Sequence, residues 1–210
     1  MDGTLINTEV HWMRAETLLV ESYGGVWTHE DGLTLVGSSL WNSATILQGR
    51  GVDLTPTEII DWLTDRVHSE VKNGVEWRPG AMELVKELRA RSIPTALVTS
   101  SMRLLAEGLA ATLDFTAFDV IVAGDDVENN KPHPEAYLKA ADLLGVEITD
   151  CVAIEDSIPG AASAVASGAR TIGVPLHSPL SEGNGYDIWP TLAGRTVADL
   201  SALFPSKDPV

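Results

Sequence analysis

An α/β fold, with a doubly wound parallel sheet and an inserted helical unit, is the fold class that this sequence predicts. Three observations lead to it. After residue 78, short apolar runs alternate with segments of helical periodicity, a pattern typical of a parallel sheet covered by helices on both faces. Residues 10–77 lack such runs. Polar residues directly follow three of the apolar runs, where ligands bind in sheets of this kind.

The segment 10–77 predicts a small helical bundle. Trp12, Ala15, Leu18 and Leu19 are expected to share one buried helical face. A second helix is expected to begin at Thr55-Pro56-Thr57-Glu58, with Thr55 as the N-cap and Pro56 in the first turn. Five of the six tryptophans of the chain lie in this segment, which supports a compact apolar core.

The alternating region runs from Arg78 to the end of the chain. Its apolar runs predict strands at 93–98, 119–124, 151–154 and 170–174. Its periodic segments predict helices at 81–91, 102–112, 134–145 and 159–168. We therefore expect the sheet-containing core to comprise residues 1–9 and 78–210, interrupted by the helical unit.

Polar pairs follow three predicted strands at their carboxyl ends. These pairs are Thr99-Ser100, Asp125-Asp126 and Glu155-Asp156. Because the carboxyl ends of parallel strands meet at one edge of the sheet, all three are expected to face one crevice.

Bulk properties narrow the class of partner. The formal net charge of -16 disfavours nucleic acid and anionic membranes, which need basic patches. An anionic substrate would need a local cation, and a metal ion can supply it. The single cysteine, Cys151, excludes an internal disulfide and is typical of a reducing compartment, so a cytoplasmic location is expected.

Four short motifs appear in a characteristic order: DGTL at 2–5, VTSS at 98–101, Lys131 within GDDVENNKPHPEAY at 124–137, and IEDS at 154–157. Each motif alone is weak, but the ordered set is specific. Together they resemble the haloacid dehalogenase superfamily, in its branch of β-phosphoglucomutase-like and sugar-phosphate phosphatase-like proteins. The resemblance implies a Rossmann-like core with a helical cap at residues 10–77.

The resemblance also implies a reaction and a set of roles. It implies Mg²⁺-dependent phosphoryl transfer through an aspartyl-phosphate. Asp2 would be the general acid and base, and Lys131 and Ser100 would complete the catalytic set. Asp2, Glu155 and Asp156 would form the metal site. The residues implied to bind phosphate are Gly3, Thr4, Thr8, Thr99 and Ser101.

The nucleophilic aspartate of this family would stand two positions before Asp2, ahead of Met1, and the strand that carries it would precede it. Three explanations remain open. The natural chain begins further upstream, or the chain is truncated, or it is a non-catalytic descendant. Of these, an upstream start is the simplest.

Asp2 also separates the reactions within the family. Dehalogenases usually carry an aromatic residue at this position, so Asp2 favours phosphate chemistry. Leu40 stands where the sugar-phosphate mutases carry a cap arginine, which favours hydrolysis of a small phosphorylated metabolite such as a sugar phosphate. A β-phosphoglucomutase-like phosphotransferase and a non-catalytic binder of a phosphate ligand with magnesium remain alternatives. The cap loop from Gly37 to Trp41 is expected to set specificity.

Overall fold

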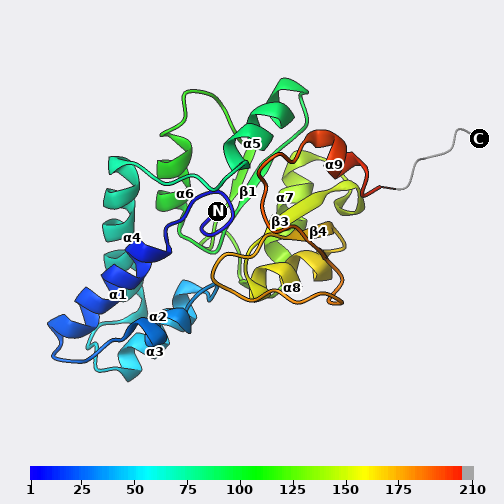
Figure 1. Ribbon diagram of the computed structural model, residues 1–210. Helices are drawn as coiled ribbons and strands as arrows, with labels where there is room; N and C mark the ends of the chain where they lie inside the picture. Colours follow the sequence, from blue (N-terminus) through cyan, green and yellow to red (C-terminus); the bar gives the residue numbers. More distant parts are fainter. Residues whose placement is uncertain (205–210) are drawn as a thin grey trace, which may run out of the picture.

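The computed structural model describes residues 1–204. Four helices gather on one side of the molecule, and the strands with their flanking helices lie on the other (Figure 1). The helices of the first group are α1 (Glu9–Ser22), α2 (His29–Leu33), α3 (Leu40–Gly49) and α4 (Pro56–Asn73). Helix α4 packs against α1 and α3, and α2 packs against α1. A helical bundle in this segment is therefore present, as the sequence predicts.

The start of α4 illustrates how local sequence determines an element. The Thr55 hydroxyl accepts a hydrogen bond from the Glu58 backbone N–H, and the Glu58 carboxylate accepts one from the Thr55 N–H at 2.8 Å. This reciprocal capping box satisfies two N–H groups that a helix start leaves without partners. Ile59, Leu63 and Val67 follow at helical spacing and are fully buried. The predicted N-cap is confirmed.

One expectation for α1 is wrong. Trp12, Ala15 and Leu19 are buried as predicted, but Leu18 is 37% exposed. Six residues along a helix correspond to a rotation of about 240° from Trp12, whereas seven residues return Leu19 to almost the same face. Leu18 therefore lies outside the buried stripe.

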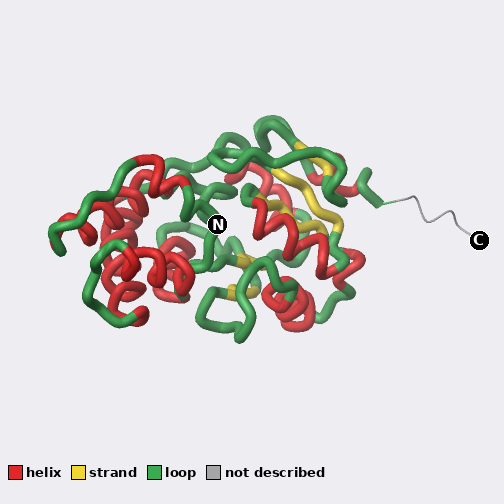
Figure 2. The backbone as a smooth tube through the Cα atoms, turned by 90° about the horizontal axis from the view of Figure 1, so that it is seen from below, coloured by secondary structure: helices red, strands yellow, loops and turns green. Residues whose placement is uncertain are grey.

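The alternating region forms the predicted α/β unit. Its helices are α5 (Ala81–Ala90), α6 (Arg103–Ala110), α7 (Glu135–Leu144) and α8 (Ile158–Ser167), with a 3₁₀ turn at Ile148–Asp150. Its strands are β1 (Ala96–Val98), β2 (Val120–Val122), β3 (Val152–Glu155) and β4 (Arg170–Gly173). All pairings between these strands are parallel, and helices flank the strands (Figure 2). A two-residue strand β5 (Asp187–Ile188), parallel to β4, and a short helix α9 (Val197–Ser201) complete the described chain.

The strands form two separate sheets. One contains β1 and β2, and the other has the order β3-β4-β5. Both β1 and β3 therefore have one edge without a strand partner within residues 1–204. The two strands line a common cavity of about 710 Å³, whose walls include the apolar side chains of Leu84, Leu97 and Ile154. This cavity is bordered by two strands and has apolar walls.

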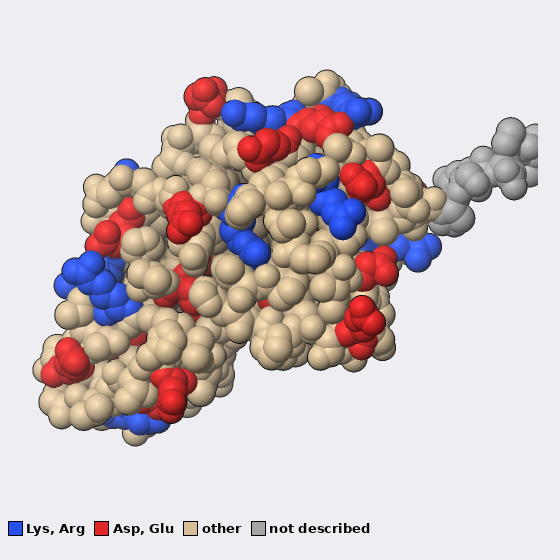
Figure 3. Space-filling model, viewed as in Figure 1, with Lys and Arg blue, Asp and Glu red and all other residues tan. Residues whose placement is uncertain are grey.

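The charged side chains are distributed over the visible surface (Figure 3). Lys and Arg side chains are interspersed with acidic ones on the face shown in Figure 3, with no extended basic patch there. Among residues 1–204, no helix has the length and apolar character that crossing a membrane requires.

Candidate active site

The carboxylate of Asp2 is held on both of its oxygens. The Thr8 hydroxyl donates to Oδ1 at 2.5 Å, and the Ser101 hydroxyl donates to Oδ2 at 2.7 Å. The indole Nε1 of Trp12 also donates to Oδ1, at 3.3 Å. The chain start, helix α1 and the end of β1 thus converge on this one group. Hydrogen bonds from three donors fix the direction of the carboxylate, as a group that transfers a proton requires.

The DGTL turn lies directly against Asp156. Gly3 has a φ of +72°, and a Cβ on it would be 2.0 Å from Asp156 Oδ2, so only glycine allows this approach. The Thr4 hydroxyl donates to Asp156 Oδ1 at 2.6 Å. Burial, followed by the neighbouring Glu155 carboxylate, raises the pKa of Asp156 to about 6. Two carboxylates, Asp2 and Asp156, therefore meet at the turn.

Arg78 holds the DGTL turn in place through hydrogen bonds to main-chain carbonyl oxygens. Its guanidinium donates to the Gly3 carbonyl oxygen, to the Val174 carbonyl at 3.0 Å and to the Pro175 carbonyl at 3.2 Å. The turn is thereby tied to the chain that leaves β4. No sequence pattern indicates this role, because the acceptors are main-chain carbonyls distant in the chain.

Lys131 forms a buried ion pair. Its Nζ lies 2.5 Å from Glu155 Oε1, which also accepts a hydrogen bond from the Tyr137 hydroxyl at 2.5 Å. Burial alone would raise the pKa of Glu155, but nearby positive charge, chiefly that of Lys131, and the hydrogen bonds from Lys131 and Tyr137 together outweigh it, and the pKa lies below the ordinary value. Glu155 is thus occupied by Lys131 and Tyr137. This arrangement suits a residue that positions Lys131 better than one that binds a metal ion directly.

The residues after β1 form a tight loop. Thr99 Oγ1 accepts a hydrogen bond from the Ser101 N–H at 3.1 Å. Gly124 lies beneath the loop, where a Cβ would be 2.3 Å from the Ser100 carbonyl oxygen. The Ser100 hydroxyl has no side-chain hydrogen bond within residues 1–204 and lines the pocket, so it is free to donate to a ligand.

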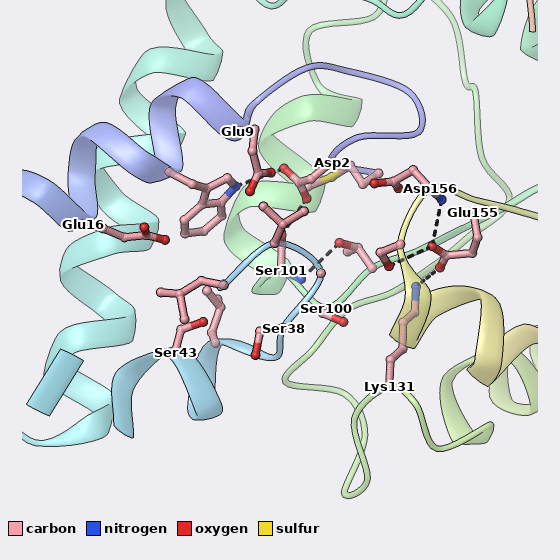
Figure 4. Close-up of a pocket in the computed structure, with 18 residues that line it drawn as sticks. Asp2, Glu9, Glu16, Ser38, Ser43, Ser100, Ser101, Lys131, Glu155 and Asp156 are labelled. Atoms are coloured by element: carbon pink, nitrogen blue, oxygen red, sulfur yellow. Dashed lines mark hydrogen bonds and ion pairs between the residues drawn. The ribbon is translucent and has the colours of Figure 1, made fainter. Parts of the chain in front are cut away.

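One pocket brings most of the predicted residues together, as Figure 4 shows. Those that line it are Asp2, Thr99, Ser100, Ser101, Lys131, Glu155 and Asp156. Gly3, Thr4 and Thr8 are not among the lining residues. Thr4 and Thr8 instead support the two carboxylates from behind, so their hydroxyls are committed to Asp156 and Asp2.

Helices α1 and α3 contribute pocket residues that the sequence motifs did not predict, chiefly Glu9, Glu16 and Ser43. Glu9, Trp12 and Glu16 line the pocket from one face of α1, and Ser38 and Ser43 line it from the α3 region. The spacing of Glu9, Trp12 and Glu16, at positions i, i+3 and i+7 directly after the DGTL turn, was a usable signal. In the expected specificity loop, Trp41 is 43% exposed and does not line the pocket, whereas Gly37, Ser38 and Leu40 do.

The pocket is strongly acidic. Its lining side chains include five carboxyl groups, those of Asp2, Glu9, Glu16, Glu155 and Asp156, and the ammonium group of Lys131. Burial first, then the charges of Asp2, Glu16 and Asp156, raise the pKa of Glu9 to about 8. Within the described chain, no cluster of three or more His, Cys, Asp or Glu side chains is arranged to hold a metal ion. A phosphate dianion could enter such a pocket only with an additional cation.

The family comparison matches most of the chain. The model of the haloacid dehalogenase-like hydrolases matches residues 1–174. This range contains all four motifs and every residue named above that lines the pocket.

Similar proteins of known name support this family match. The chain is 34% identical to fructose-1-phosphate phosphatase YqaB of Escherichia coli, over 84% of this chain and 94% of that protein. It is 33% identical to a phosphorylated carbohydrates phosphatase of Thermotoga maritima, over 85% of this chain and 83% of that protein. Against three Arabidopsis thaliana relatives, one of them a bifunctional riboflavin kinase/FMN phosphatase, the chain spans only 19%, 48% and 47% of their lengths.

Solved structures show the same architecture. The crystal structure of CbbY from Rhodobacter sphaeroides in complex with phosphate superposes with a TM-score of 0.86, at 29% identity and with 96% of each chain covered. A mutant of the same protein, in complex with xylulose-(1,5)bisphosphate, gives the same TM-score of 0.86 at 28% identity, with 95% of this chain and 96% of that chain covered.

Proposed function

The chain belongs to the haloacid dehalogenase-like hydrolase family, and from this premise we propose that it is a Mg²⁺-dependent hydrolase of small phosphomonoesters such as sugar phosphates. The observation that carries the proposal is the doubly held Asp2 carboxylate, which shares one pocket with Lys131 and Asp156. The names of two relatives, a fructose-1-phosphate phosphatase and a phosphorylated carbohydrates phosphatase, support the class of substrate.

The donor set of the pocket fits magnesium. Mg²⁺ uses one or two carboxylates and completes its shell with water and phosphate oxygens, so it does not need a cage of three protein carboxylates. Asp156 would supply a carboxylate and Asp2 its main-chain carbonyl oxygen, which leaves the Asp2 carboxyl group free for proton transfer. Glu155 is occupied by Lys131, so we assign it to positioning Lys131 rather than to the metal. The ion would neutralise phosphate charge that the five carboxyl groups of the pocket otherwise repel.

The nucleophile in this proposal is an aspartate two positions before Asp2, at the end of a strand that precedes Met1. The cavity between β1 and β3 supports it, because the cavity is lined by Met1, has apolar walls and borders two strands with unpaired edges. A strand there would join the two sheets and deliver a carboxylate beside Asp2.

The reaction then proceeds in two steps. The aspartate carboxylate attacks phosphorus and the bond to the leaving oxygen breaks, while Asp2 donates its proton to that oxygen. Asp2 next takes a proton from water, whose oxygen attacks phosphorus and releases phosphate and the free carboxylate. The Lys131 ammonium and the Ser100 hydroxyl stabilise the negative charge on the phosphoryl oxygens in both steps.

The helical segment 10–77 serves in this proposal as a cap that excludes water. The pocket measures only about 90 Å³, below the roughly 300–1,000 Å³ of typical ligand sites, so the cap would have to open for a substrate to enter. A phosphotransferase remains the second candidate. It is less favoured because Leu40, rather than a cation, lines the cap side of the pocket.

The test is phosphate release by the protein expressed with the residues that precede Met1 in its reading frame, from a panel of sugar phosphates and p-nitrophenyl phosphate, with Mg²⁺ and with EDTA. We expect release with Mg²⁺ only, and loss of at least a hundredfold in kcat/KM for Asp156→Asn. Asp142→Asn is the matched control, because Asp142 is an exposed residue of α7 that does not line the pocket. Release that persists in EDTA, or an Asp156→Asn variant with full activity, would overturn the proposal.

A further inference from the structure

The end of the pocket formed by α1–α3 contains polar groups that the phosphoryl chemistry does not use. Glu16 on α1 and Ser43 on α3 both line the pocket, although they are only 5% and 4% exposed. Figure 4 places Glu16 and Ser43 on the side of the pocket away from Lys131 and Glu155. This distal end is therefore separate from the phosphoryl end.

Both side chains have unused hydrogen-bonding capacity. Glu16 Oε2 accepts a hydrogen bond from the indole Nε1 of Trp27 at 3.2 Å, and Oε1 has no partner within residues 1–204. The Ser43 hydroxyl likewise has no side-chain hydrogen bond among the described residues. Within the part of the chain that the structure describes, neither atom is a fully buried atom without a partner, so water in the pocket can reach both, and a ligand hydroxyl would take the place of that water.

The position of Glu16 indicates how far a ligand must reach. Trp12 contacts Asp2 through its indole nitrogen, and Glu16 lies one helical turn further along α1, about 6 Å along the axis. A ligand that contacts both ends must extend several bonds beyond its phosphoryl group.

The charge of the distal end selects among polar ligands. Glu16 faces it from α1, while Lys131 is at the opposite end (Figure 4). A second phosphate or a carboxylate at this end would meet the Glu16 carboxyl group, with no cationic side chain among the described residues that line this end. Burial raises the pKa of Glu16 to about 7, so its carboxyl group is able both to donate and to accept a hydrogen bond near neutral pH. An uncharged hydroxyl group is complementary to such a partner.

We propose that Glu16 and Ser43 determine specificity by binding a hydroxyl group at the far end of the substrate, so that the protein selects polyhydroxylated monophosphates over alkyl phosphates and over substrates with a second anionic group. The proposal rests on the proposed phosphatase function. It adds to that function a specificity determinant in the cap and a limit on substrate charge.

Three six-carbon esters test it with the full-length protein: sorbitol 6-phosphate, n-hexyl phosphate and 6-phosphogluconate. They differ in the hydroxyl groups and in the charge of the far end. We expect kcat/KM for sorbitol 6-phosphate to exceed the values for the other two at least tenfold. Glu16→Gln keeps the side-chain shape and removes the titratable charge. We therefore expect the ratio of kcat/KM for sorbitol 6-phosphate to kcat/KM for 6-phosphogluconate to fall at least fivefold in this variant.

Ser43→Ala removes one hydroxyl and should lower the preference for sorbitol 6-phosphate over n-hexyl phosphate about three- to tenfold, mainly through KM. Glu21→Gln, at an exposed position of the same helix, should change neither ratio. Equal use of the three esters by the wild type, or ratios unchanged in both Glu16→Gln and Ser43→Ala, would overturn the inference and leave the phosphatase proposal intact.

A wild type that hydrolyses none of these esters, nor p-nitrophenyl phosphate, would instead count against the phosphatase function. Calorimetric titration with sorbitol 6-phosphate and n-hexyl phosphate then still decides the inference. Tighter binding of the sorbitol ester that is lost in Ser43→Ala would support it, and equal binding of the two esters would contradict it.

Discussion

At the scale of single residues, hydrogen bonds from Thr8, Trp12 and Ser101 fix the Asp2 carboxylate, which lines the pocket and which we propose as the general acid and base. If Asp2 protonates the leaving oxygen, its loss should matter less for a leaving group that needs no proton. We predict that Asp2→Asn lowers kcat/KM for sorbitol 6-phosphate by about 10²–10⁴-fold but lowers kcat/KM for p-nitrophenyl phosphate by a much smaller factor, because kcat/KM reports the departure of the leaving group and not the hydrolysis step that both esters share. Steady-state kinetics on both esters at saturating Mg²⁺ measures this difference. Equal losses would mean that Asp2 acts as a ligand or a structural residue only.

Glu16 gives a prediction about stability and pH. Its pKa is about 7 in the folded chain and ordinarily 4.5, so the folded state holds the proton more tightly. The free energy of unfolding should therefore fall as pH rises from about 4.5 to about 7. Glu16→Gln does not titrate. The free energy of unfolding of Glu16→Gln, relative to that of the wild type, should therefore rise by up to roughly 3 kcal/mol between about pH 4.5 and 8. Urea unfolding measures this difference. A difference that stays constant across this range would show that Glu16 is not desolvated.

The residues of the site differ in how far the sequence could predict them. Asp2, Ser100, Lys131 and Asp156 belong to ordered motifs, and the structure brings them to one pocket. The role of Glu16 was not predictable in the same way, because its burial arises from packing against Trp27, eleven positions away. Likewise, the Tyr137 hydroxyl can donate to Glu155 only because α7 lies close to β3 in the folded chain. No local sequence pattern predicts that proximity.

At the scale of elements, the loop before α3 closes the pocket against α8. Gly37 has a φ of +75°, and a Cβ on it would be 2.6 Å from Ser157 Cβ. We predict that Gly37→Ala raises KM for sorbitol 6-phosphate at least tenfold, because the loop can no longer pack on the residues after β3. Gly49→Ala is the control, since Gly49 ends α3 with nothing within 4 Å of a Cβ. Equal KM values in the two variants would refute closure at this contact.

The sequence predicted the type of each main helix and strand better than it predicted where each one begins and ends. The alternation of apolar runs and periodic segments located all four main strands, but β1 begins at Ala96 rather than at residue 93. Pro94 has no N–H to contribute to a ladder, which accounts for a late start. The two-residue strand β5 and the helix α9 were not predicted. Asp187 and Ile188 are too few to show an alternating pattern, and five residues are too few to show helical periodicity.

At the scale of the whole molecule, the two sheets and the cavity of about 710 Å³ between them are the feature on which the mechanism depends. A parallel strand in this cavity would pair with β1 and β3, cover apolar walls and end beside Asp2. The sequence resemblance predicted the strand, and the cavity adds a volume and two unpaired edges that fit it. The proposed mechanism thus depends on such a strand.

The most direct test measures Mg²⁺-dependent phosphate release from sorbitol 6-phosphate by the protein expressed with the residues that precede Met1 in its reading frame. The account predicts an apolar strand ending in an aspartate two positions before Asp2, turnover by this protein, and loss of turnover when that aspartate is replaced by asparagine. Undiminished turnover after the replacement, or an extended protein that binds the phosphate ester without hydrolysing it, would contradict the account.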